Sequence, residues 1–177
     1  MIIVNLFGVP GAGKSTGAAY IFSQLKMHGI NAELVTEFAK DKVWEENPVV
    51  FKNQVYIFGK QSFKISRCKG KVDAIVTDSP LLLSALYNED PVLGEDFNKV
   101  VNNVFKSYDN MNYLVLRTKP YNPIGRRQTE EESDALAKPM MDLLVKYDVR
   151  SKMIIGEPDG YNIVVEDVLR RMNDGQI

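Results

Sequence analysis

A glycine-rich segment near the start of the chain has the residue types and the spacing that bind phosphate groups. It reads Gly8-Val9-Pro10-Gly11-Ala12-Gly13-Lys14-Ser15-Thr16 and fits the pattern G-x-x-x-x-G-K-[ST]. The segment follows an apolar run over residues 2–7 and opens a stretch with helical spacing, which is the context that this motif requires. Glycines let consecutive backbone N–H groups turn toward phosphates, and the start of a helix adds positive potential there. The segment therefore predicts a site for ATP.

Each residue of this loop has an expected role. Lys14 should reach the β- and γ-phosphates and assist catalysis, the Ser15 hydroxyl should bind Mg²⁺, and Thr16 should lie near the α-phosphate. A glycine-rich turn that binds no nucleotide is the structural alternative, and Lys-Ser at this register argues against it. The remaining nucleotide contacts should come from the backbone of four loop residues, Gly8, Gly11, Ala12 and Gly13.

Two carboxylates stand where further apolar runs end. Glu37 follows residues 33–36, and Asp78 follows residues 74–77. Ligands gather at the carboxyl ends of parallel strands, so both carboxylates are candidates for catalysis and for substrate binding. Asp78 should bind Mg²⁺ directly or through water, or accept the proton of the acceptor, while Glu37 should hold an acceptor hydroxyl or act as its general base. A helix N-cap or a surface charge is the structural alternative for each.

Three arginines surround a loop rich in proline and glycine. Arg117 ends the fourth apolar run, and Arg126 and Arg127 close the loop over residues 118–128. We expect residues 118–130 to form a lid in which Arg126 and Arg127 stabilise the transferring phosphoryl group and Arg117 contacts the nucleotide. The alternative is that Arg126 and Arg127 are solvated and balance the carboxylates of residues 130–132.

Five short apolar runs alternate with longer segments of helical spacing, which predicts an α/β fold with a parallel sheet covered by helices. The expected strands are residues 2–7, 32–36, 74–77, 113–117 and 153–156. The expected helices are residues 14–28, 47–68, 94–108, 129–147 and 161–172, with a helical turn at 81–86. Asn47 and Pro48 should begin the second helix, and a Thr129–Glu132 capping box the fourth. A chain of 177 residues should form one domain, residues 1–177.

Composition narrows the classes of function. The 22 Lys and Arg residues against 23 Asp and Glu give a net charge of −1, which supplies no field for a polyanion and speaks against nucleic acid as a partner. The single histidine, His28, excludes a cluster of histidine metal ligands, and the single cysteine, Cys68, excludes an internal disulfide. We expect neither a signal peptide nor a membrane span, and a cytoplasmic location. The chain also lacks the Asn-Lys-x-Asp and D-x-x-G motifs of GTPases, which favours transfer to a bound acceptor over hydrolysis.

These residues resemble the nucleoside and nucleotide kinases among P-loop proteins, above all small kinases of the nicotinamide-riboside-kinase type. The shared features are the loop 8–16, the segment Thr36-Glu37-Phe38-Ala39, a long helix containing Gln, and the turn Asp78-Ser79-Pro80. Thymidylate kinases are similar too, with Asp-Arg at that turn. The resemblance implies a three-layer P-loop fold with a five-stranded parallel sheet in the order 2-3-1-4-5. It also implies the use of ATP and Mg²⁺, and acceptor contacts from Glu37, Gln54 and Asp78.

The expected function is the transfer of the γ-phosphate of ATP to a small-molecule acceptor, a nucleoside or a nucleoside monophosphate. Two alternatives stay open. One is a kinase that acts on a hydroxyl of a nucleic acid, at a modified base or at an end. The other is a regulatory ATP-binding module or slow ATPase. A homodimer is compatible with all three.

Overall fold

Five parallel strands form the sheet of the described part of the chain, which in this computed structural model comprises residues 1–46, 48–124 and 128–174. Neighbouring strands are hydrogen-bonded in the order β2-β3-β1-β4-β5. This confirms the α/β fold and the strand order that the kinase resemblance implied. The strands are β1 (Ile2–Phe7), β2 (Ala32–Val35), β3 (Ala74–Thr77), β4 (Asp109–Leu116) and β5 (Lys152–Ile155).

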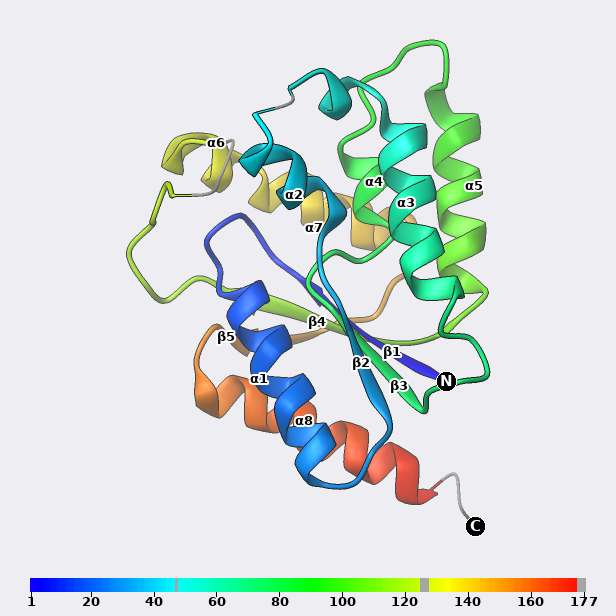
Figure 1. Cartoon of the computed structure of the whole chain (residues 1–177). Coiled ribbons are helices and arrows are strands. Elements are labelled where there is room, and N and C mark those ends of the chain that lie inside the picture. The colour runs from blue at the N-terminus through cyan, green and yellow to red at the C-terminus, as the bar shows by residue number, and fades with distance from the viewer. Residues whose placement is uncertain (47, 125–127, 175–177) are drawn as a thin grey trace.

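Helices cover both faces of the sheet and make a three-layer structure (Figure 1). One face carries α1 (Lys14–Met27) and α8 (Pro158–Asp174). The other face carries α3 (Gln54–Ser66), α4 (Leu83–Leu86), α5 (Gly94–Lys106) and α7 (Ala137–Lys146).

The central strand β1 contributes to both hydrophobic cores, because successive side chains of a strand point to opposite faces. Val4 packs in the core shared with α1 and α8, and Ile3 packs in the core shared with the other helices. All six residues of β1 are buried, as is typical of a strand covered on both faces. The loop that follows β1 is thus anchored by a fully buried strand.

The expected helices over residues 47–68 and 129–147 differ most from those in the structure, the last helix begins three residues earlier than expected, and one helix was not expected. The helix predicted over residues 47–68 begins only at Gln54, because the Asn53 side chain caps it by accepting a hydrogen bond of 3.0 Å from Tyr56 N. A 3₁₀ helix, Pro48–Lys52, precedes it, and Asn47 lies outside the described residues. The short helix α2 (Phe38–Trp44) follows β2 and was missed.

The helix predicted over residues 129–147 is divided at Leu136 into α6 (Glu130–Ala135) and α7. The predicted capping box is confirmed. Thr129 Oγ1 accepts a hydrogen bond from Glu132 N at 3.2 Å, and Thr129 N donates to the Glu132 carboxylate at 2.8 Å. The capping box fixes where α6 begins.

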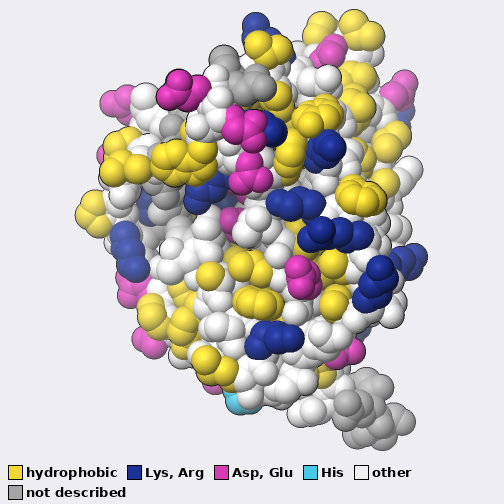
Figure 2. Space-filling model, viewed as in Figure 1, with side chains coloured by type: hydrophobic (Ala, Val, Ile, Leu, Met, Phe, Trp, Pro, Cys, Tyr) yellow, Lys and Arg dark blue, Asp and Glu magenta, His cyan; other side chains and the backbone are white. Residues whose placement is uncertain are grey.

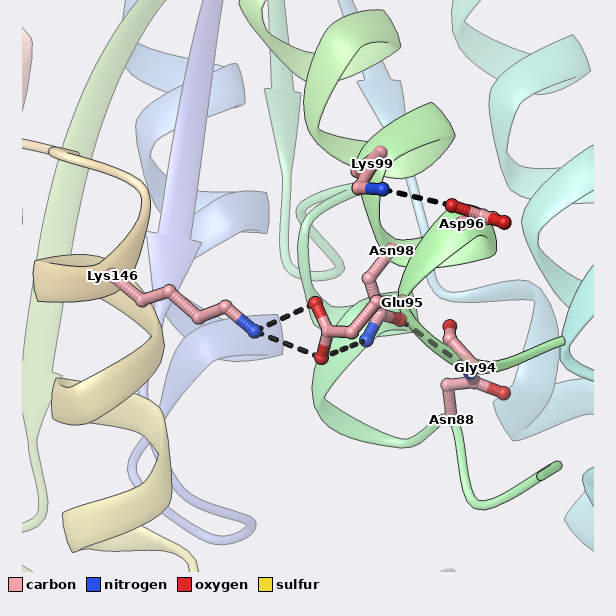
Figure 3. Close-up of polar contacts among 7 residues, drawn as sticks. All are labelled: Asn88, Gly94, Glu95, Asp96, Asn98, Lys99 and Lys146. Atoms are coloured by element: carbon pink, nitrogen blue, oxygen red, sulfur yellow. Dashed lines mark hydrogen bonds and ion pairs between the residues drawn. The ribbon is translucent and has the colours of Figure 1, made fainter.

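An ion pair joins the beginning of α5 to the end of α7 (Figure 3). Lys146 Nζ donates hydrogen bonds of 2.9 and 2.8 Å to the two carboxylate oxygens of Glu95. The Asn88 amide closes the preceding loop by donating to Gly94 O and Asn98 Oδ1, both at 3.2 Å. Water screens the ion pair because both charged side chains are at least half exposed. The buried cores, rather than this pair, therefore hold α5 and α7 to the sheet.

Within the described residues, no helix combines the length and the apolar character that a membrane span needs.

Candidate phosphoryl-transfer site

The glycine-rich loop between β1 and α1 has the conformation that phosphate binding requires. Gly11 and Gly13 have φ values of 83° and 96°, in the left-handed region that favours glycine. No side chain caps α1 at Gly13, so the first N–H groups of this helix keep their capacity to bind an anion. Ser15 and Thr16 are exposed at the start of the helix. The residues expected to contact nucleotide therefore converge on one loop and one helix start.

Lys14 lies across this loop. Its Nζ donates hydrogen bonds to the carbonyl oxygens of Gly8 at 2.7 Å and Val9 at 3.1 Å. These contacts hold the ammonium group over the loop, where a compact cation can bind phosphate oxygens. The phosphate contacts expected of Lys14 stay a prediction.

Glu37 and Asp78 come together as the sequence predicted, because β2 and β3 are neighbours. Val35 pairs with Thr77, so the residues after both strands leave the same edge of the sheet. The Asp78 carboxylate is 3% exposed and accepts a hydrogen bond of 2.9 Å from Glu37 N. Glu37 occupies the N-cap position of α2, but its side chain makes no cap hydrogen bond. Glu37 is thus the N-cap residue by position, but its carboxyl group does not cap the helix.

The environment of Glu37 is unusual for a carboxylate. Burial raises the pKa of Glu37 above its usual value of 4.5, and the nearby charge of Asp78 raises it further, whereas Lys14 lowers it. Glu37 thus interacts electrostatically with both Lys14 and Asp78. A desolvated carboxylate beside a cation is suited to accept a proton from a hydroxyl group.

Gln61 was missed by the sequence reasoning, although it organises this edge of the sheet. The Gln61 side chain is 3% exposed, and its Oε1 accepts a hydrogen bond of 2.9 Å from Phe38 N. Its Nε2 is 3.4 Å from both Thr36 O and Ser79 O. One amide thereby ties the segment that carries Glu37 to the segment that carries Asp78. A polar residue in the buried stripe of an amphipathic helix was the signal that could have revealed it.

Gln54, the glutamine that the sequence analysis chose, has a different contact. It is buried, and its Nε2 donates to Phe51 O at 3.3 Å, within the turn that precedes α3. Its expected contact with an acceptor stays a prediction.

Tyr87, which follows α4, is a second residue that the sequence reasoning did not select. Burial raises the pKa of Tyr87 to about 12, and the negative charge of Glu37 adds to the shift. The phenol is therefore neutral at physiological pH and can donate a hydrogen bond beside Glu37. This adds a hydroxyl donor to the two carboxylates.

Arg117, the arginine expected to contact the nucleotide, lies beside the glycine-rich loop. The Arg117 side chain is 15% exposed and is paired with Asp134 and with Glu130, the latter at 3.5 Å. Its Cδ lies 3.7 Å from the position that a Cβ on Gly11 would take. Arg126 and Arg127 lie outside the described residues, so their role in a lid stays a prediction.

The oxygen donors at the site fit a Mg²⁺ ion that arrives with a nucleotide. Such an ion is usually held by one or two protein oxygens together with phosphate oxygens and water. Ser15 offers a hydroxyl at the start of α1, and Asp78 offers a carboxylate at the end of β3. Among the described residues there is no group of three or more His, Cys, Asp or Glu side chains that could hold a metal by itself. The donors therefore suit a Mg²⁺ site that is completed by the nucleotide phosphates and water, rather than one built from protein ligands alone.

No family model matches the chain, and no curated protein matches its sequence. Among solved structures, deoxyadenosine kinase from M. mycoides with bound dATP aligns with a TM-score of 0.58 at 21% sequence identity. The alignment covers 97% of this chain and 99% of that one. The same kinase with the products dCMP and a flexible dCDP bound aligns with a TM-score of 0.58, 18% identity and the same coverage. The chain therefore shares the fold of deoxyadenosine kinase, built on a parallel sheet in the order 2-3-1-4-5.

Proposed function

We propose that this protein is a kinase that transfers the γ-phosphoryl group of ATP to a hydroxyl group of a nucleoside or nucleoside monophosphate. The observation that carries the proposal is the convergence of Glu37 and Asp78 at the edge of the sheet next to Lys14. Two carboxylates beside a phosphate-binding lysine provide both a base and a metal ligand.

On the nucleotide side, the loop 8–16 binds the triphosphate. The backbone N–H groups and Lys14 neutralise charge on the β- and γ-phosphates. Ser15 and Asp78 would hold Mg²⁺, which when bound would supply electrophilic assistance to the transfer. Arg117 contributes a further cation beside Gly11, and Arg126 and Arg127 contribute the cations of the lid.

On the acceptor side, Glu37 takes the proton of the attacking hydroxyl group. The acceptor oxygen forms a bond to the γ-phosphorus as the bond from that phosphorus to the β,γ-bridging oxygen breaks, and ADP leaves with the negative charge. Lys14 stabilises that charge. The raised pKa of Glu37 supports this role, because a stronger base accepts a hydroxyl proton more readily.

The acceptor is proposed to be a nucleoside or its monophosphate because the residues around Glu37 combine carboxylate, phenol and amide groups. Tyr87 and Glu37 suit the hydroxyl groups of a sugar, and Gln54 suits the edge of a base. The fold shared with deoxyadenosine kinase puts deoxynucleosides first among the candidates. Lys60 and Lys64, on α3, leave a monophosphate open as an acceptor.

An ADP-release assay with an acceptor panel tests the proposal. The panel contains deoxynucleosides, ribonucleosides, their 5′-monophosphates, nicotinamide riboside and a DNA duplex with and without 5-hydroxymethylated bases. Release is expected to be slow with ATP alone and to rise with one of the small acceptors. The Lys14→Met variant, which removes the ammonium group from the phosphate loop, should lower the stimulated rate at least 10²-fold.

Three outcomes would change the assignment. Phosphate transfer to the duplex alone would keep the kinase and replace the acceptor. A panel that never stimulates turnover, together with a protein partner that does, would favour the regulatory ATP-binding module. A Lys14→Met variant with at least a tenth of the wild-type rate would remove the phosphate loop from the mechanism.

A further inference from the structure

The short helix α6 contacts the phosphate loop although more than 110 residues separate them in the sequence. Ser133 is fully buried, and its hydroxyl donates a hydrogen bond of 2.8 Å to Pro10 O. Pro10 directly precedes Gly11, whose positive φ shapes the loop. Because the capping box sets the beginning of α6, Ser133 holds a defined position relative to this carbonyl group.

A second connection from α6 to the phosphate loop passes through Arg117. Nη2 of Arg117 is paired with Asp134, and Glu130 lies 3.5 Å from the same nitrogen. Nη1 of Arg117 is buried and has no hydrogen-bond partner among the residues that the structure describes. A buried guanidinium N–H without a partner is costly, so this nitrogen is prepared for an acceptor that the protein does not itself supply.

The path of the Arg117 side chain shows where that acceptor would lie. Its stem passes Gly11, and its guanidinium carbon lies 5.4 Å from the centre of the Tyr121 ring. The Tyr121 ring in turn lies 2.9 Å from the position that a Cβ on Gly11 would take. Arg117 therefore lies beside Tyr121 and against Gly11, in the loop whose N–H groups are proposed to bind phosphate.

We infer that α6 positions the phosphate loop and Arg117 for ATP, with Asp134 orienting the guanidinium and Ser133 fixing the Pro10 carbonyl. Arg117 bridges two anions: Nη2 stays on Asp134, and Nη1 donates to a phosphate oxygen of the nucleotide. A guanidinium group holds two anions on two separate nitrogens of a rigid planar fork, whereas an ammonium group presents all its donors from one nitrogen. Ser133 and Asp134 are positioning residues, which act through Pro10 and Arg117. The inference rests on the proposed function, since it requires ATP at the loop.

A carboxylate this near to a triphosphate would repel it if its only effect were its charge. The two Asp134 variants separate charge from orientation. Asp134→Asn removes the charge and keeps an oxygen that can accept from Arg117, while Asp134→Ala removes both. If orientation matters, Asp134→Ala weakens ATP binding about tenfold, in keeping with the loss of one charge-assisted hydrogen bond to Arg117. Asp134→Asn, which keeps an acceptor oxygen, changes ATP binding about threefold or less.

Isothermal titration calorimetry with ATP, without an acceptor, measures these affinities on the full chain. A double-mutant cycle joins Asp134→Ala to Arg117→Ala, and the double variant should bind ATP no more weakly than Arg117→Ala alone.

Glu131→Ala is the matched control, since it removes an exposed carboxylate from the same helix and should leave ATP affinity unchanged. Ser133→Ala should weaken ATP binding several-fold, because the loop carbonyl loses its partner. Thermal denaturation of each variant confirms folding.

Additive effects in this cycle, or a Glu131→Ala variant that loses as much affinity as Asp134→Ala, would overturn the inference and leave the kinase proposal intact. If Asp134→Ala does not fold, Arg117→Lys replaces it in the comparison. A lysine has one nitrogen in place of Nη1 and Nη2 and cannot keep the planar geometry of the fork, so Arg117→Lys should weaken ATP binding, and Asp134→Asn added to it should have no further effect. Arg117→Lys with wild-type affinity contradicts the inference. A wild-type chain that binds no ATP overturns the inference and the proposed function together.

Discussion

Glu37 lowers the stability of the folded protein at neutral pH, although it is the residue proposed as the general base. Its pKa is raised mainly by burial, so keeping it ionised in the folded protein costs free energy that the unfolded chain does not spend. The Asp78 charge adds to this cost, and Lys14 offsets part of it. Such strain is characteristic of residues placed for chemistry rather than for folding.

Glu37→Gln should lower kcat on the order of 10²-fold while raising the melting temperature at pH 7. The folded-state pKa of Glu37 is raised, so the stability contributed by this group is fully present below its unfolded-state pKa. That stability is lost as the pH rises through the folded-state pKa. Glu37→Gln removes the titrating carboxyl group, so the variant does not suffer this loss of stability at neutral pH. Calorimetric melting at pH 4 and pH 7 measures the effect, and a variant that melts lower than wild type at pH 7 contradicts the account.

The pH dependence of kcat/KM should also report Glu37. Activity is expected to fall on the acid side as Glu37 becomes protonated, at a pH above the usual carboxyl value of 4.5. The residual activity of Glu37→Gln should lack this acid limb. If the limb persists unchanged in that variant, another group is the base.

At the scale of elements, the ends of β2 and β3 are joined by a side chain from α3. Gln61 is hydrogen-bonded to Phe38 N and lies within hydrogen-bond distance of Thr36 O and Ser79 O. Lys64, about one turn further along the same helix, donates to Thr36 O at 2.8 Å. The position of Glu37 relative to Asp78 therefore depends on α3 as well as on the sheet.

Gln61→Met should destabilise the protein by about 1–3 kcal/mol, because it leaves buried backbone groups without a partner at nearly the same side-chain volume. It should also lower kcat, since the segments that carry the two carboxylates are no longer tied together. Urea denaturation and steady-state kinetics measure both effects. Gln54→Met, which loses one contact with Phe51, provides the comparison and should cost less stability. Equal stability losses would mean that Gln61 has no special role.

The contact between α1 and α8 provides a second test at this scale. Gly17→Ala should destabilise the protein by about 1–3 kcal/mol, because the new Cβ would stand 2.4 Å from the buried Tyr161 ring. An alanine in an open helix interior instead stabilises by up to about 1 kcal/mol. Gly59→Ala, in α3 with no atom near the added Cβ, is the control and should be neutral or stabilising. A stabilised Gly17→Ala would show that α8 is not packed this closely on α1.

At the scale of the whole molecule, charges of both signs are spread over the surface. Figure 2 shows Lys and Arg side chains across the middle of one face, with Asp and Glu side chains around them. The net charge of −1 gives the chain no overall positive charge of the kind that holds a nucleic acid backbone. A small acceptor that is recognised inside the site needs no such field.

The protein should therefore bind duplex DNA weakly, with a dissociation constant above roughly 10 μM at 150 mM salt. Fluorescence anisotropy of a labelled duplex across a salt series measures this affinity. Tight binding that weakens steeply with salt would instead support a nucleic acid acceptor. The homodimer stays a prediction, and sedimentation equilibrium tests it.

The sequence alone was enough to predict the features that depend on local order along the chain. Residues close to one another in the sequence determine three of these features: the glycine-rich loop between β1 and α1, the capping box before α6, and the alternation of strands and helices. For the same reason, Glu37 and Asp78 could be found from their places after apolar runs, since parallel strands end at one edge of a sheet.

The tertiary structure decided the contacts between segments far apart in the sequence. Gln54 and Gln61 are two turns apart on the same helix, and only the packing of α3 against the sheet shows that Gln61 reaches the two strand ends. Likewise, no local pattern indicates that Ser133 bonds to Pro10 or that Tyr161 lies against Gly17. Such contacts depend on how the helices are oriented on the sheet, which is determined by the two cores as a whole rather than by any neighbouring residues.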